Sequence, residues 1–199
     1  MTRTLDVGMS AFALVMLAPL FGMIALAIRI KDPGPVFFAH RRIGQEGKWF
    51  GCLKFRSMVI DAEFRLADVL DNDPDAAAEW HDSQKLRKDP RVTALGRFLR
   101  RSSLDELPQL LNVLRGEMSI VGPRPIVADE IARYGENFAA YCSVRPGITG
   151  AAQISGRTDL AYKDRVRIDT DYIARKSLLV DLLIVMKTVP HVMTGKGAV

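Results

Sequence analysis

Cysteine and histidine are scarce in this sequence. Its 199 residues include two cysteines, Cys52 and Cys142, and three histidines at widely separated positions. The cysteines form no CxxC pair, and no His/Cys spacing matches a zinc site. The sequence therefore predicts two reduced thiols in a cytosolic compartment, rather than a structural zinc site or a disulfide framework.

Two common phosphate-binding motifs are also missing. Neither GxGxxG nor GxxxxGK[ST] occurs between a predicted strand and a helix, which excludes nucleotide binding through a Rossmann or P-loop motif. The length and the 48% hydrophobic content predict one globular domain, with two small domains as the alternative. The net charge of +5 indicates an anionic partner, but does not choose among nucleic acid, anionic lipid and a phosphorylated substrate.

One segment lacks charge altogether. Residues 7–28 are apolar and long enough to cross the hydrocarbon core of a bilayer. A secretory signal peptide is the disfavoured alternative, because the run is longer than a usual h-region and no small-residue cleavage site follows it. Pro19 lies near its middle, and cations flank both ends, with Arg3 before it and Arg29 and Lys31 after it. A helix that breaks at Pro19 and returns to the face it entered would explain both features, while a kinked spanning helix stays as the alternative.

The rest of the chain favours helices with few strands. Residues 36–40 and 49–56 flank the turn IGQEGK and predict a β-hairpin. Predicted helices cover residues 58–70, 76–84, 108–115, 127–144, 159–175 and 178–193, and predicted loops cover 71–75 and 145–157. No strict βαβ alternation appears, so we expect an α+β, mainly helical fold. The last helix is too polar to span a membrane but could lie in its interface.

The stretch SLDELPQL places two acids, Asp105 and Glu106, among several arginines. Ser103 and Glu106 have the spacing of a capping box, so a purely structural helix start is one interpretation. A helix N-terminus and nearby arginines would also keep Asp105 ionised. An ionised carboxylate can attack phosphorus, and a second one can help to hold Mg²⁺.

Other segments offer weaker signals for phosphate binding. Two prolines fix the backbone around Arg124 in GPRP, and a planar guanidinium suits a phosphate, although a solvated arginine on a rigid turn is the simpler interpretation. The glycines of GITG and SGR could let backbone N–H groups approach an anion. Lys54 and Arg56 fall on a predicted strand, where a solvated face is more common than a ligand.

Together these motifs carry a family resemblance. The segments GPVFF, RIGQEGKWF, KFRSM, DPRVTALGRFLRRSSLDELPQLLNVLRGEMSIVGPRP, RPGITG, QISGR and SLLVDLLIVMKT resemble the bacterial sugar transferases, the monotopic phosphoglycosyl transferases. The resemblance covers nearly the whole chain, and its most specific block runs from SLDELPQL to VGPRP. Many members carry extra transmembrane helices before this core, so the chain resembles the minimal form. QISGR and GKGAV resemble the exopolysaccharide branch, whose members often transfer galactose-1-phosphate or glucose-1-phosphate.

The resemblance implies an enzyme with two substrates. It would transfer a sugar-1-phosphate from a UDP-sugar to polyprenol (undecaprenyl) phosphate and release UMP. The lipid bilayer is the implied partner and nucleic acid is not, while the oligomeric state stays open, a homo-oligomer included. The implied location is the cytosolic face of the bacterial inner membrane. A membrane-anchored, non-catalytic basic binding protein and a plain single-span protein are the alternatives.

The resemblance also implies roles for individual residues. Asp105 matches the nucleophile and Glu106 its acidic partner, with Mg²⁺ as the cofactor held near them. Pro19 matches the break of a re-entrant helix, although the preceding residue, often serine in the family, is Ala18 here. The implied substrate-binding or phosphate-binding residues are Arg100, Arg124, Arg157, Lys54 and Asp181.

The implied organisation has two parts. Residues 1–31 would form the re-entrant membrane helix. Residues 32–199 would form a cytosolic catalytic domain with short strands and interfacial amphipathic helices, among them the C-terminal segment. The site would lie at the membrane surface, where it can reach both a soluble and a lipid substrate.

Overall fold

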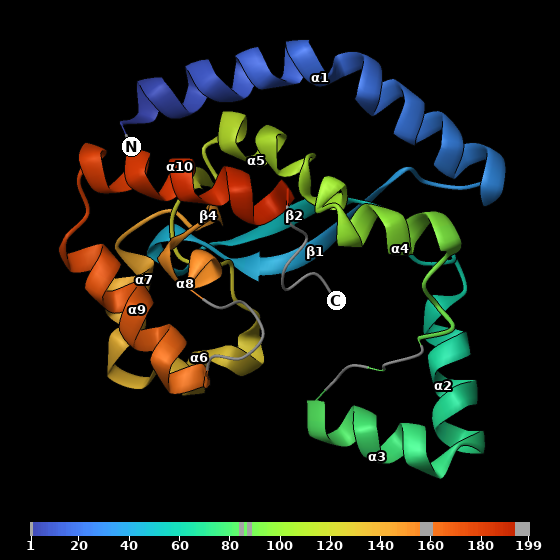
Figure 1. Cartoon of the computed structure of the whole chain (residues 1–199). Coiled ribbons are helices and arrows are strands. Elements are labelled where there is room, and N and C mark those ends of the chain that lie inside the picture. The colour runs from blue at the N-terminus through green and yellow to red at the C-terminus, as the bar shows by residue number, and fades with distance from the viewer. Residues whose placement is uncertain (1, 84–85, 87–88, 156–160, 194–199) are drawn as a thin grey trace.

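Helices dominate the fold, and the strands are short and pair in twos. The computed structural model describes residues 2–83, 86, 89–155 and 161–193. The longest helix, α1 (Arg3–Lys31), lies along one side of the molecule above a central β-hairpin (Figure 1). A lobe of short helices lies on one side below the hairpin, and two helices, α2 and α3, project on the other. The predicted mainly helical α+β class is confirmed.

Most of the remaining helices follow the predicted order, but the helix at Ala94–Arg101 was not predicted. α10 has the predicted bounds, and Gly135, with φ of 52°, divides the segment predicted as one helix at residues 127–144. The predicted acidic loop at 71–75 is wrong, because α2 runs through Asn72 and α3 starts at Pro74. The helices are α2 (Ala62–Asn72), α3 (Pro74–Ser83), α4 (Ala94–Arg101), α5 (Gln109–Arg115), α6 (Ile131–Tyr134), α7 (Phe138–Cys142), α8 (Ala151–Ile154), α9 (Tyr162–Ala174) and α10 (Leu178–Met193).

The predicted hairpin is confirmed. Strands β1 (Phe37–Ile43) and β2 (Trp49–Phe55) pair in antiparallel register, with Phe38 opposite Lys54 and His40 opposite Cys52. β1 ends three residues later than predicted, because the polar run HRR continues to alternate between the two faces of the sheet. Directly opposed residues share a face, so the pleat places Lys54 beside β1 residues 38 and 40.

The free edge of β2 is completed by a side chain instead of a strand. Asn112, fully buried on α5, accepts a hydrogen bond from the Leu53 N–H at 2.9 Å. Its amide nitrogen donates to the carbonyl oxygen of Gly51 at 2.8 Å. One amide therefore satisfies two backbone groups that would otherwise be buried without partners.

A second strand pair corrects the prediction that residues 145–157 are irregular. Strands β3 (Ser119–Val121) and β4 (Gly147–Thr149) are parallel, and α8 follows directly. The Gly147 N–H donates to the Pro123 carbonyl at 2.8 Å. A Cβ on Gly122 or Gly147 would collide with the facing backbone, so these two glycines permit the close approach.

The N-terminal end of α1 is attached to the globular part. Asp6 is buried, and its carboxylate accepts hydrogen bonds from the Ser119 hydroxyl at 2.9 Å and from the Ile120 N–H at 3.0 Å. Arg3 donates to the carbonyl oxygens of Val113 and Leu114 at the end of α5. Charge-assisted bonds of this kind are the stronger ones in proteins, so they hold this end firmly.

The C-terminal end of α1 is attached to the same globular part. Ile24 and Ile28 pack with Phe55 of β2. Arg56 is buried and pairs with Asp32, the residue that ends α1, at 3.3 Å. The prediction that Arg56 belongs to a solvated face is therefore wrong. Between its two attached ends α1 arches over the domain (Figure 1).

The middle of α1 is apolar and exposed. By length and composition α1 could cross a membrane, yet only 11% of its most apolar window is buried, so it is not a core helix. The helix continues through Pro19, which has no N–H to donate to the preceding turn. Its exposed large apolar residues are Leu5, Val7, Met9, Phe12, Val15, Met16, Met23, Leu26 and Ile30.

A polar cluster lies inside the lobe of short helices. Tyr134 and Tyr141 are both buried there, and the Tyr134 hydroxyl donates to Asp169 Oδ2 at 2.9 Å. Burial raises the pKa of Asp169 to about 6, although the hydrogen bond from Tyr134 and the charge of Arg165 oppose the shift. Arg165 also pairs with Glu130 at 3.3 Å, so the cluster ties α9 to the segment before α6.

Candidate active site

The two adjacent acids lie in a tight turn instead of at a helix start. Residues Leu104–Glu106 form the 3₁₀ turn η2, which α4 precedes, and α5 begins only at Gln109. Ser103 has a φ of 56° and makes no side-chain cap, so the predicted capping box is wrong. Ser103 therefore lies in the left-handed region between α4 and η2, and Asp105 in the turn that follows is buried.

Lys54 meets both carboxylates of this turn. Its ammonium group donates to Glu106 Oε1 at 2.8 Å and lies 3.6 Å from Asp105 Oδ2. Asp105 is buried, whereas the side chain of Glu106 is 34% exposed. One carboxylate of the pair therefore lies inside the protein and the other lies nearer its surface. Sequence reasoning gave Lys54 a lesser role than the structure does.

The surroundings of Asp105 shift its pKa in opposite directions. Burial raises the pKa of Asp105, and the adjacent Glu106 raises it further. Lys54 and Arg100 oppose this rise but do not overcome it. The sequence indicated only the effect of the nearby cations, because burial cannot be read from the sequence alone.

The predicted arginines have different surroundings. Arg100, on α4, donates from Nε to the Ser57 hydroxyl at 2.9 Å, and its charge interacts with that of Asp105. Arg124 is exposed on the GPRP loop, and its charge reaches His40 and Arg42 on β1. Arg157 lies outside the described residues.

Asp181 belongs to a different cluster. It is fully buried at the start of α10 and accepts a hydrogen bond from the Tyr172 hydroxyl at 2.7 Å. Tyr172 packs with Val121 and Ile184, between α9, α10 and β3. The structure therefore brings Lys54, Arg100, Asp105 and Glu106 together, with Asp181 held in this separate contact.

Two residues near the site, His40 and Arg42, were not predicted from the sequence. His40 accepts a hydrogen bond at Nδ1 from Arg42 at 3.1 Å, and because a guanidinium can only donate, the ring proton of neutral His40 sits on Nε2. Burial lowers the pKa of His40, and nearby cations lower it further. Those cations are Arg42, Lys54 and Arg124. The available signal in the sequence was the set of basic residues on two strands predicted to pair, His40 and Arg42 on one and Lys54 on the other.

The N–H of Gly147, one glycine of the predicted GITG anion cradle, is already used in a backbone hydrogen bond. The Gly147 N–H donates to Pro123, and the Thr149 carbonyl accepts from Gly122. These backbone groups are therefore used to fix the GPRP loop next to β1. Arg42 contributes to the same result by donating to the Pro125 carbonyl at 3.1 Å.

The donor set of Asp105 and Glu106 fits Mg²⁺ better than zinc. Within the described ranges, no three His, Cys, Asp or Glu side chains gather as a metal cage. Magnesium commonly takes one or two carboxylates and fills its other positions with water and substrate phosphates. The two neighbouring carboxylates could supply such a partial shell.

The chain is similar to known proteins over nearly its whole length. A family model described as "Bacterial sugar transferase" matches residues 1–195. The exopolysaccharide production protein ExoY of Sinorhizobium fredii is 48% identical over 98% of this chain and 87% of that protein. Undecaprenyl-phosphate galactose phosphotransferase of Salmonella typhimurium is 48% identical over 98% of this chain and 41% of that protein. UDP-glucose:undecaprenyl-phosphate glucose-1-phosphate transferase of Caulobacter vibrioides is 42% identical over 98% of this chain and 71% of that protein.

Proposed function

The chain belongs to the bacterial sugar transferase family, and we propose that it transfers a sugar-1-phosphate from a UDP-sugar to undecaprenyl phosphate. The observation that carries the proposal is the cluster of Asp105, Glu106 and Lys54. Two carboxylates that share one ammonium suit phosphoryl chemistry, whereas a surface that only docks anions gains nothing from them. The relatives named as galactose and glucose transferases support a hexose as the sugar.

The first step would be attack by Asp105. One carboxylate oxygen forms a bond to the β-phosphorus of the donor, and the bond from that phosphorus to the bridging oxygen breaks. UMP leaves with the bonding electrons, and the sugar phosphate stays on Asp105 as an acyl phosphate. Splitting the transfer in this way lets the soluble and the lipid substrate react in turn.

The second step would return the carboxylate. A phosphate oxygen of undecaprenyl phosphate attacks the same phosphorus, and the bond to Asp105 breaks. The product is an undecaprenyl-diphospho-sugar. No net proton transfer is needed, so the protein supplies mainly positioning and charge neutralisation.

The surrounding cations would neutralise the phosphates. Lys54 and Arg100 already interact with Asp105, and Arg124 projects from the rigid GPRP loop on the same side as His40. Asp105 must be ionised to attack, and these cations favour that form. When bound, Mg²⁺ would add charge neutralisation between the carboxylate pair and the donor's phosphates.

The Mg²⁺ requirement has its own test. Treatment with a chelator should abolish UMP release, and added Mg²⁺ should restore it. Full activity in excess chelator would remove the metal from the proposal.

The arrangement of α1 supports a monotopic membrane association. A straight helix of its 29 residues would be roughly 43 Å long, more than the ~30 Å core of a bilayer. If α1 spanned the bilayer, its two ends would lie on opposite sides, and only one of them could contact the globular domain. Here Asp6 at one end and Ile28 at the other both contact the same domain. A helix that dips into one leaflet, bent near Pro19, fits this constraint.

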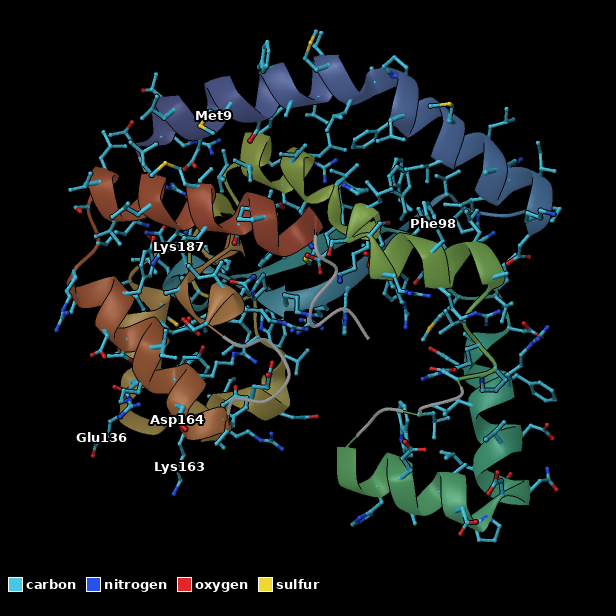
Figure 2. All side chains as sticks on the ribbon, in the orientation of Figure 1. Met9, Phe98, Glu136, Lys163, Asp164 and Lys187 are labelled. Atoms are coloured by element: carbon cyan, nitrogen blue, oxygen red, sulfur yellow. The ribbon has the colours of Figure 1, made fainter. Side chains whose placement is uncertain are left out.

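Other apolar surfaces would complete the membrane-facing side. Met9 on α1 and Phe98 on α4 lie in the upper layer of Figure 2, whereas Glu136, Lys163 and Asp164 lie at the opposite end of the molecule. Helix α10 adds exposed apolar residues: Leu178, Leu179, Leu182, Leu183 and Met186. We infer that residues 1–31 enter the inner membrane from its cytosolic face and that residues 32–199 remain on that face.

The topology is tested by labelling. A single accessible cysteine at position 2, in a variant whose other cysteines are replaced, should react from the cytosolic side of sealed inside-out vesicles. Reaction only from the opposite side would show a spanning helix and remove the re-entrant proposal.

The activity is tested by UMP release from UDP-galactose or UDP-glucose with undecaprenyl phosphate. Wild type should release UMP and Asp105→Asn should not. Asp164→Asn is the matched control, because Asp164 is a partly exposed acid paired with Arg167 on α9. No release by wild type with any UDP-sugar of a broad panel would favour a non-catalytic binding protein.

A further inference from the structure

Phe38 is an exposed aromatic residue on the side of the hairpin that carries the site. It is 54% exposed and lies directly opposite Lys54 in the β1–β2 register. Opposed residues on antiparallel strands have Cβ atoms about 5 Å apart, so the ring and the ammonium group are neighbours. Phe38 also lies beside His40, with ring centroids 6.0 Å apart.

The preceding residue, Phe37, shows that Phe38 is not exposed in order to contact α1 or the membrane. Phe37 points to the other face of the hairpin, where its ring stacks on Phe55 at 5.4 Å. Phe55 in turn contacts Phe21 of α1 at 5.2 Å. The helix and its proposed membrane face are therefore on the Phe37 side, and Phe38 faces away from them.

We propose that Phe38 stacks on the nucleobase of the donor. The inference rests on the proposed function, because Lys54 and the carboxylate pair mark where the donor's diphosphate would lie. A ring next to Lys54 is within reach of the nucleoside attached to that diphosphate. A phenyl ring has no hydrogen-bonding atom, so it suits the flat face of a base better than the hydroxyl-rich edge of a hexose.

His40 supports the placement of the donor's diphosphate beside the hairpin. Its Nε2–H is the only ring proton of the neutral tautomer, because Nδ1 accepts from Arg42. A phosphate between Lys54 and Arg124 could accept that proton's hydrogen bond. The hairpin would then hold the donor by charge at Lys54, by a hydrogen bond from His40 and by stacking at Phe38.

The experiment compares two adjacent phenylalanines on opposite faces. Phe38→Leu and Phe37→Leu both keep an apolar side chain and are measured as full-length protein in nanodiscs. Calorimetry gives the dissociation constants of UDP, UMP and inorganic pyrophosphate. Phe38→Leu should weaken UDP and UMP by about ten-fold and leave pyrophosphate within about two-fold, since only the nucleotides carry a base. Phe37→Leu should change none of the three.

Several results would overturn the inference. Unchanged UDP affinity in Phe38→Leu, or an equal loss for UDP and pyrophosphate, would show that the ring does not stack on the base. Wild type that binds neither UDP nor pyrophosphate would instead contradict the proposed function, so the two failures are distinguishable.

Discussion

The ammonium group of Lys54 donates a hydrogen bond to Glu106 Oε1 at 2.8 Å, and so joins strand β2 to the turn that carries both acids. The same ammonium lies 3.6 Å from Asp105 Oδ2. One cation therefore offsets the repulsion between two adjacent carboxylates, one of which is buried. Such a shared charge is weakly screened by water and matters more than a surface ion pair.

Replacing Lys54 should reduce catalysis strongly. Lys54→Met removes the charge that faces both Asp105 and the donor's phosphates. We expect UMP release to fall by at least about 100-fold, the usual size of losing one preorganised electrostatic contact. Steady-state assays with saturating Mg²⁺ measure the effect.

The matched control for that change is Lys48→Met. Lys48 is 78% exposed in the hairpin turn and pairs only with exposed Glu46 among the ion pairs described. It should keep wild-type activity. Lys54→Met with activity close to that of the Lys48 variant would show that the Lys54 contacts are not used in the reaction.

Removing the side-chain edge of β2 should destabilise the fold. Asn112→Ala leaves the Gly51 carbonyl and the Leu53 N–H without their partner, in a fully buried position. We expect a loss of about 2–4 kcal/mol in the free energy of unfolding, from unsatisfied polar groups. Denaturant titration of protein in detergent measures it.

Asn72→Ala provides the comparison, since Asn72 is exposed at the end of α2 and bonds only within its own helix turn, to Asp68. Its cost should stay within about 0.5 kcal/mol. Equal stability of the two variants would mean that Asn112 does not support the strand.

The buried Asp169 should give stability a defined pH dependence. Its folded pKa of about 6 lies above the unfolded value of 3.8, so the native state binds the proton more tightly than the unfolded chain does. Its contribution is fully present below pH 3.8 and is lost as the pH rises through about 6. The loss is roughly 2–3 kcal/mol, because one pKa unit corresponds to about 1.4 kcal/mol.

The difference between wild type and Asp169→Asn isolates this effect. Asparagine cannot ionise but can still accept the hydrogen bond from Tyr134. The stability of wild type relative to the variant should fall between pH 4 and pH 6 and then level off. A difference that is constant over this range would show that Asp169 does not titrate as the structure indicates.

Much of the local structure could be predicted from the sequence. The hairpin follows from alternation around IGQEGK, and α10 follows from its apolar periodicity, down to both end residues. The uncharged apolar run at residues 7–28 indicated the long apolar helix that α1 forms. These features depend on neighbouring residues in the chain.

The rest depends on contacts between distant residues. Asp6 bonds to Ser119, and Asn112 to Gly51, across separations that no periodicity encodes. The burial that raises the pKa of Asp105 was not foreseen, because it depends on how η2 packs against β2. The site residue His40 was missed because its only signal, basic residues on paired strands, depends on the register of the hairpin.

The most direct test of the account is whether Asp105 carries the sugar phosphate during turnover. Purified protein in nanodiscs is mixed with labelled UDP-sugar without undecaprenyl phosphate, quenched within milliseconds to seconds, and digested for peptide mass spectrometry. The account predicts a phosphosugar adduct on the peptide containing Asp105, lost when undecaprenyl phosphate is added and absent in Asp105→Asn. UMP release with no adduct, or an adduct on another residue, would contradict it.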